Sequence, residues 1–273
     1  MKKAAIAGLA ALTLLDISAA TPVAAQNASA FQGGYIGGHA GGATTNSMSF
    51  KSNPYNVTGL AQDPTEVYSI PGRNDEFDFN SFVGGVHSGF NFVTPGNFLF
   101  GIEGDWSILT GDDTVSFDSG FVVPNSGDNS DGASFMHRSQ VDLEWQGTIR
   151  GRAGFIAGNT LFFATAGIAF LNADWKETAT VTECGNSCDP GDPTTTRNYS
   201  DSSTLTGAVV GAGVEIAIAP NIIVGGDYLY ETFDSFGSVP FGHTTPGQRG
   251  SLGDLDVHKV RVRVSVKFGA PAQ

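Results

Sequence analysis

The segment VHKVRVRVSVKF (Val257–Phe268) decides the fold, because apolar and polar residues alternate along most of its length. One face of an extended strand would carry four valines and a phenylalanine, namely Val260, Val262, Val264, Val266 and Phe268. The other face would carry Arg261, Arg263, Ser265 and Lys267. This period of two predicts a β-strand and not a helix. The length is close to the roughly 9–11 residues with which a tilted strand crosses a bilayer.

Seven other segments have strand character, which brings the expected number of strands to eight. The composition agrees, since 37 Gly and 20 Phe among 273 residues suit β-structure better than helix. We therefore predict an all-β fold. The seven segments are Gly34–Ala43, Phe79–Phe92, Phe98–Leu109, Val141–Phe155, Leu161–Trp175, Thr206–Ala217 and Ile222–Phe233.

The connections between these segments alternate in length. Three are short and contain the Gly, Pro or Asn that tight turns need: Thr94–Asn97, Ala157–Thr160 and Ala219–Asn221. Four are long and polar: Thr44–Asp78, Thr110–Gln140, Lys176–Thr204 and Asp234–Asp256. Short periplasmic turns and long extracellular loops are the organisation of an outer-membrane β-barrel. We predict an eight-stranded antiparallel transmembrane barrel with four long extracellular loops.

A soluble eight-stranded barrel or a β-sandwich is the alternative fold. It would turn the charged faces of the strands to water and would have to fill a narrow interior with the large apolar faces. In a membrane barrel the charges point into the lumen, where they need partners of opposite sign. Acids and bases both occur on these faces, so we favour a lumen charge network. Its expected members are Glu103, Asp105, Glu144, Arg150, Arg152, Glu215, Asp227, Glu231, Arg261, Arg263 and Lys267.

Aromatic residues and one histidine complete the assignment of faces. His87 is expected to point inward from the second strand. Aromatic girdles or the lipid-facing band would contain Tyr35, Trp106, Trp145, Phe162, Phe170, Tyr228 and Tyr230.

The N-terminus is typical of an export signal. Lys2 and Lys3 precede the apolar run Ala4–Leu15. The segment Val23–Ala25 provides a cleavage site, and Ala28–Ala30 is a second candidate. Residues 1–25 are therefore predicted to be a signal peptide, and residues 26–273 a single barrel domain. An uncleaved anchor is the alternative, but the apolar run is short for a span of about 20 residues. The formal net charge of −13 argues against nucleic acid as a partner, because phosphate binding needs a basic surface.

Few residues suggest chemistry. Glu103 and Asp105 are expected to pair with arginines and not to act as an acid and a base, and no Ser-His-acid pattern is recognisable. His137 and His243 lie in predicted loops and are candidate ligands for haem or a metal, but no zinc-like spacing is present. We predict no enzyme activity, no cofactor and no metal. Cys184 and Cys188 are expected to form a disulfide under oxidising conditions outside the cytoplasm.

Several motifs resemble one known family. These are GGYIGGHAGG (Gly33–Gly42), FVGGVHSGFNF (Phe82–Phe92), GIEGDW (Gly101–Trp106), GTIRGRAGF (Gly147–Phe155) and GGDYLY (Gly225–Tyr230). They are similar to strands of the small, opacity-protein-like outer-membrane β-barrels of α-proteobacteria, which include surface antigens and haemin-binding barrels. The resemblance implies the barrel-assembly machinery as a partner. Such barrels usually end on a terminal Phe, whereas five residues follow Phe268 here.

These observations together predict a protein of the outer membrane with a structural and surface-interaction role. The apolar faces would contact outer-membrane lipid and lipopolysaccharide, and the acidic loops would meet an unknown surface partner. A narrow porin or a haemin-binding surface protein is the alternative function. A lipid-modifying enzyme is a third hypothesis.

Overall fold

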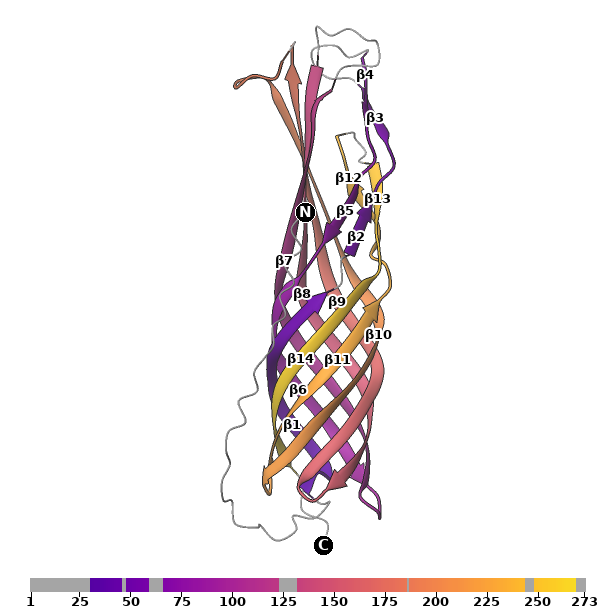
Figure 1. Ribbon diagram of the computed structural model, residues 1–273, viewed down its shortest axis with the longest axis vertical. Coiled ribbons are helices and arrows are strands. Elements are labelled where there is room, and N and C mark those ends of the chain that lie inside the picture. The colour runs from indigo at the N-terminus through magenta and orange to yellow at the C-terminus, as the bar shows by residue number, and fades with distance from the viewer. Residues whose placement is uncertain are drawn as a thin grey trace, which may run out of the picture.

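The computed structural model describes residues 30–45, 48–58, 66–122, 132–185, 187–243 and 248–268. The predicted signal peptide and the residues after Phe268 lie outside this part of the chain. All the regular elements of the described residues are β-strands, which confirms the predicted all-β class (Figure 1). Within these residues no helix is both long enough and apolar enough to span a membrane.

Eight strands pair edge to edge into a closed barrel, and every pair is antiparallel. The barrel closes where the first strand pairs with the last, with Gly34 opposite Phe268 and Thr45 opposite Val257. In barrel order the strands are β1 (Gly33–Thr45), β14 (Leu255–Phe268), β11 (Ile222–Phe233), β10 (Thr194–Ala219), β9 (Thr160–Cys184), β8 (Gly132–Ala157), β7 (Phe98–Val122) and β6 (Asn80–Val93).

The lower end of the barrel in Figure 1 carries the three tight turns expected from the sequence. The β6–β7 turn places Gly96 and Asn97 at φ values of 105° and 67°, and the β8–β9 turn places Gly158 at 63°. Glycine adopts this region freely and asparagine tolerates it, which explains the choice of turn residues.

The outer wall of the barrel is apolar. On β14 the four valines Val260–Val266 and Phe268 are exposed, Val262 to 68% of its surface, while Arg261 and Arg263 are buried between them. The same exposed apolar face continues over β6–β11 (examples are Phe90, Ile102, Ile149, Phe162 and Val214). An outward belt of this kind, about ten residues tall on each strand, is what a barrel in a lipid bilayer presents to the acyl chains.

Above this belt the structure differs from the expected polar loops. β7, β8, β9 and β10 are 25 or 26 residues long and continue far beyond the barrel wall, as Figure 1 shows. Beside them lie two small sheets. One has the order β12 (Gly237–Phe241), β13 (Gln248–Leu252), β2 (Met48–Lys51) and β5 (Asn74–Phe77), and the other pairs β3 (Tyr55–Thr58) with β4 (Val67–Ile70).

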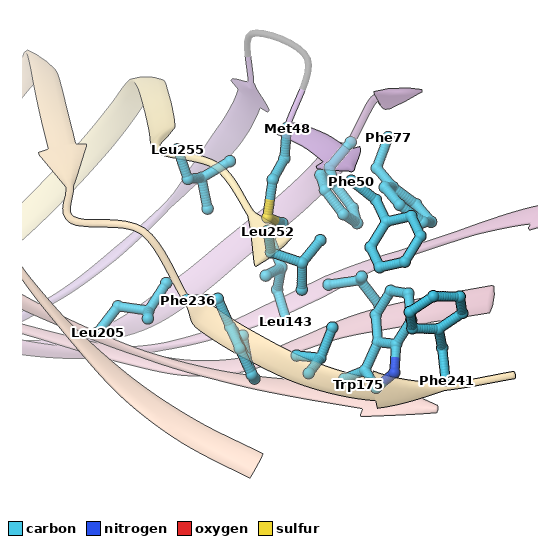
Figure 2. Close-up of a cluster of buried hydrophobic side chains, with 14 of the residues drawn as sticks. Met48, Phe50, Phe77, Leu143, Trp175, Leu205, Phe236, Phe241, Leu252 and Leu255 are labelled. Carbon is cyan, nitrogen blue, oxygen red and sulfur yellow. The ribbon is translucent and has the colours of Figure 1, made fainter. Parts of the chain in front are cut away.

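We call this region the upper domain: the described parts of residues 48–77, 111–143, 173–204 and 237–252. It has its own apolar core, in which Trp175 stacks on Phe50 with ring centroids 5.2 Å apart and Phe241 meets Phe50 edge-on. Figure 2 shows these rings beside Phe77, Leu143, Leu252 and neighbouring side chains. The prediction of four long polar loops was therefore wrong for most of their length. Their polar composition concealed a second alternation that buries residues such as Phe135 and Val181.

Strand β8 changes its inward face where the barrel meets the upper domain. In the barrel its even-numbered residues, such as Arg150 and Thr148, are buried, whereas in the upper domain its odd-numbered residues, such as Val141 and Phe135, are buried. The switch occurs at an irregularity in the pairing with β9 between Leu143 and Gln146, where two residues of β8 oppose one residue of β9. An extra residue of this kind is a β-bulge, and it shifts every side chain beyond it by one position.

Candidate functional site: the sealed lumen and a buried histidine pair

The centre of the barrel lumen holds four arginines and four carboxylates, and all eight side chains are buried. They are Arg150, Arg152, Arg261 and Arg263, with Glu103, Asp105, Glu215 and Asp227. Equal numbers of opposite charges neutralise each other, which is the condition under which charges are tolerated away from water.

Glu103 is the most highly connected acid of the network. Nη2 of Arg150 lies 2.5 Å from its Oε1, Nη1 of Arg152 lies 3.2 Å from its Oε2, and Arg263 contacts both oxygens. The hydroxyl of Tyr35 also donates a hydrogen bond to Oε2 over 2.7 Å. One carboxylate thus joins arginines from β8 and β14, which lie on opposite sides of the closed barrel.

The remaining acids extend the network around the lumen. Asp227 accepts two hydrogen bonds from Arg261, at 2.9 and 2.7 Å, in a bidentate pair between directly opposed residues of β11 and β14. Asp105 lies 2.6 Å from Arg150 and 3.2 Å from Arg261. Glu215 lies 2.9 Å from Arg152 and 3.0 Å from Arg263. The ion pairs therefore cross-link five of the eight barrel strands.

Glycines lie directly opposite the arginines on the neighbouring strands, where the backbones approach closely. Gly167 is the cross-strand partner of Arg150, and Gly101 is the partner of Arg152. A Cβ atom at Gly167 would lie 2.0 Å from the carbonyl oxygen of Ile149, closer than any real contact. Gly41 is likewise the cross-strand partner of Arg261, and Gly225 is the partner of Arg263.

Two of the expected side-chain positions were wrong, those of Glu144 and Tyr35, and a third residue, Lys267, lies at the edge of the lumen set. Glu144 lies in the bulge of β8 and is exposed, because the bulge places it on the outer face with Trp145. Lys267 is on the inward face but only half-buried at the turn end, two residues beyond Ser265. Tyr35 is not in an outer girdle but 2% exposed inside the lumen, next to Glu103 and Arg152.

Sequence reasoning also missed two members of the lumen set, Lys259 and His39. Nζ of Lys259 lies 2.5 Å from Glu231, and Gln146 makes hydrogen bonds to both. His39 and His87, the latter expected to point inward, contact each other. Nε2 of His39 lies 2.8 Å from the hydroxyl of Ser107, and Nε2 of His87 lies 2.8 Å from the hydroxyl of Ser265. Continuing the alternation of β14 by one step before Arg261 in the sequence would have found Lys259.

Buried apolar clusters lie on both sides of the charges along the barrel. Toward the turns, Phe31, Leu99, Leu161 and Ile223 belong to a buried cluster, and Phe163 in that cluster lies under the guanidinium of Arg152 at 4.1 Å. Toward the upper domain, the main core begins with residues such as Leu143, Leu205, Leu229 and Val257. The described residues thus form an apolar, a charged and a second apolar layer along the barrel axis.

A second buried polar cluster lies in the upper domain and contains both histidines singled out from the sequence. His137 is on β8 and 0% exposed, and His243, 5% exposed, follows β12. Their Nε2 atoms lie 3.2 Å apart. Oη of Tyr55, on β3, lies 3.0 Å from Nε2 of His137. Nδ1 of His137 lies 2.7 Å from Oε1 of Glu177 on β9.

Burial and neighbouring charges shift the pKa values of groups in this cluster. Arg73 lies 3.4 Å from Glu177 and 2.6 Å from Asp75, and Ser139 donates a hydrogen bond to Glu177. Burial lowers the pKa of His243 to about 3, with a further lowering by His137, Arg197 and Arg73, so its imidazole is neutral near pH 7. Burial and the charge of Glu177 raise the pKa of the Tyr55 hydroxyl.

The two cysteines form a disulfide at the end of the β9–β10 hairpin. Cys184 and Cys188 are bonded with their Cα atoms 4.7 Å apart. The bridge closes a short loop at the tip of the upper domain.

A closed barrel with an outward apolar belt and an inward charge network defines the class of integral β-barrel membrane proteins. The chain matches the family described as "Outer membrane protein beta-barrel domain" over residues 7–268 and belongs to that family. It is therefore a protein of the outer membrane, as the sequence motifs indicated.

Two curated relatives are outer-membrane antigens of Brucella. The 31 kDa outer-membrane immunogenic proteins of Brucella melitensis biotype 1 and Brucella suis biovar 1 are each 27% identical over 282 aligned positions, covering 98% of this chain and 100% of the relative. Among solved structures, Neisserial surface protein A is 12% identical with a TM-score of 0.35, covering 87% of this chain and 98% of the other.

Proposed function

We propose that this protein is a non-conducting outer-membrane anchor that holds a folded, acidic domain above the cell surface. The barrel turns lie on the periplasmic side and the upper domain lies outside. The observation that carries this proposal is the layered lumen, in which a neutralised ion network is buried between two apolar clusters.

The layered lumen argues against a porin. A porin holds a continuous aqueous path, and its charged residues line that path. Here Arg150 and Arg261 are 1% and 2% exposed and make direct ion pairs instead of lining an aqueous path. The apolar layers add a barrier that a hydrated ion would have to cross without partners.

The geometry also argues against the enzyme hypothesis. Ser107 lies 2.8 Å from Nε2 of His39, but Nδ1 of His39 faces His87 and not a carboxylate. A serine nucleophile needs an acid to orient its histidine and an open approach for substrate. This pair is buried within the sealed lumen and has neither.

The burial of the two candidate histidines argues against haemin capture by histidines in open loops, which is the other alternative. His137 and His243 were expected in open loops, but both are buried and face each other across 3.2 Å. A planar macrocycle could reach them only if the β12–β13 hairpin moved off the core.

Two experiments test the proposed function. The first is planar-bilayer recording with the purified protein: we expect no channel events, and stepwise conductance would overturn the non-conducting lumen.

The second experiment tests the orientation with one epitope tag at two matched turns. A tag at Pro190–Gly191, on the β9–β10 tip, should bind antibody on intact cells. The same tag at Gly158–Asn159, in the β8–β9 turn, should bind only after the outer membrane is permeabilised. The opposite result would place the upper domain in the periplasm and end the surface-display proposal.

A further inference from the structure

We propose that His137, His243 and Tyr55 form a binding site for a divalent first-row transition-metal ion inside the upper domain. The three ligands come from β8, from the residues after β12 and from β3, so they are brought together only by the folded domain. The site is independent of the lumen and of any conducting or anchoring role.

The two distances that join His137 to the other donor atoms are compatible with a single ion. In a tetrahedral site with metal–nitrogen bonds of about 2.0–2.1 Å, two ligand nitrogens lie roughly 3.3 Å apart. The Nε2 atoms of His137 and His243 are 3.2 Å apart, and Oη of Tyr55 is 3.0 Å from Nε2 of His137. Two imidazoles and one oxygen donor suit Zn²⁺, Cu²⁺ and neighbouring ions better than Ca²⁺ or Mg²⁺, which prefer oxygen ligands alone.

Glu177 orients His137 as metal-binding histidines are usually oriented. Its Oε1 accepts a hydrogen bond from Nδ1 of His137 over 2.7 Å, which leaves the Nε2 lone pair directed at the other two donors. A carboxylate on the far nitrogen of a ligating histidine fixes the tautomer and makes the imidazole a stronger donor. Ser139 and Arg73 hold Glu177 in turn.

The hydrogen bonds of the cluster do not satisfy all of its atoms. With Nδ1 of His137 as a donor, its Nε2 has one lone pair and faces both the Tyr55 hydroxyl and Nε2 of His243. Nδ1 of His243 is buried and has no hydrogen-bond partner among the described residues. If that nitrogen carries the proton of His243, two lone pairs face each other across 3.2 Å, and a cation between them would remove the repulsion.

A tyrosine supplies the third ligand. The described residues contain no group of three His, Cys, Asp or Glu side chains placed to hold a metal ion, so the proposed site depends on the phenol. Gly242 helps to place His243, because its φ of 95° turns the chain after β12 and leaves space for Tyr55, whose ring would lie 3.4 Å from a Cβ there.

An ion bound by these three side chains would connect the small sheets of the upper domain to the long barrel strands. Tyr55 and His243 belong to the small sheets and their connections, whereas His137 belongs to a barrel strand. Because the ligands converge only in the folded state, binding should stabilise the upper domain.

Zinc binding to the full-length mature protein in detergent, purified without a histidine tag, tests the site. Zn²⁺ competition with a chromophoric chelator should give one ion per chain with a dissociation constant below about 1 µM. His243→Phe keeps an aromatic ring against Phe135, 5.0 Å away, but removes both nitrogens, and it should weaken binding at least 100-fold. Tyr55→Phe should weaken it about 10-fold, because a phenol is the poorest of the three donors.

His258→Ala is the matched control, since His258 contacts Tyr228 on the outer wall of the barrel. It should bind zinc like the unsubstituted protein. Co²⁺ should show the intense visible bands of a tetrahedral site, and these should disappear in His243→Phe. Circular dichroism of each variant separates lost binding from lost folding. No stoichiometric binding by the unsubstituted protein, or equal binding by a folded His243→Phe variant, would overturn the proposal.

Discussion

The barrel and the upper domain share four strands but bury opposite kinds of residue. In the barrel, β8 buries Arg150 and exposes Ile149, whereas in the upper domain it buries Phe135 and exposes Arg138. The difference follows the solvent: lipid accepts apolar side chains on the outside of the barrel, and water outside the upper domain does not. One strand can bury charged residues in the barrel and apolar residues in the upper domain because the bulge at Glu144 shifts its alternation by one residue.

The largest expected effect comes from Arg150→Leu, which leaves Glu103 and Asp105 with an unbalanced buried charge. Removing one partner of a buried ion pair costs about 3–5 kcal/mol. In urea unfolding from lipid vesicles, we expect the free energy of unfolding to fall by an amount near the upper end of this range. The heat-induced mobility shift on gels should occur at a lower temperature. Arg138→Leu, on the outer face of the same strand, should change neither. An unchanged Arg150→Leu barrel would contradict the lumen network.

Trp175→Ala tests the other core and should cost about 3 kcal/mol, because it removes a fully buried indole that stacks on Phe50. The loss should be confined to the upper domain. Limited proteolysis in detergent should cut residues above the belt and leave a heat-modifiable barrel fragment. If the barrel unfolded together with the upper domain, the two regions would be one cooperative unit and the comparison would fail.

Lysine at two outward positions of β8 distinguishes the two solvents directly. Ile149→Lys, within the apolar belt, should cost about 2–3 kcal/mol, as charges do near the bilayer midplane. Met136→Lys, on the outer face of the upper domain, should cost about zero because its side chain already faces water. Folding equilibria in vesicles measure both. Equal costs would mean that the belt extends further up the strands than the exposed residues indicate.

The smallest effect on the whole molecule is expected from Cys184→Ser. The disulfide closes a loop with a sequence separation of 4, for which the chain-entropy estimate is about 2 kcal/mol, and this acts on the hairpin tip alone. Amide hydrogen exchange should rise near Cys184 and stay unchanged at Trp175 and in the barrel. Faster exchange throughout the upper domain would show that the bridge supports the core as well.

The sequence predicted the barrel better than the upper domain for a physical reason. Lipid on one side of the barrel wall and a charged lumen on the other require strongly apolar and charged residues in turn. The alternation of valine and arginine is therefore visible in the segment that ends at Phe268. The upper domain mixes Phe135, His137 and Ser139 on one buried face, which resembles a polar loop when only composition is considered. The bulge at Glu144 could not be predicted, because an extra residue in one strand is visible only against its neighbour.

The candidate sites divide in the same way. Arg150 and Glu103 could be paired from alternation and strand order, and the structure places them directly opposite each other. His137 and His243 were noticed separately, but their meeting depends on how the hairpin after β11 folds over the long strands. No local pattern contains that information. Tyr55, the third member of the cluster, gave no signal at all.

The continuity of β7–β10 has a mechanical consequence. Each of these strands runs for 25 or 26 residues, roughly 80 Å of extended chain, from the tight turns into the upper domain without an intervening linker. The upper domain is therefore built directly on barrel strands, and the course of these strands sets its position relative to the barrel wall.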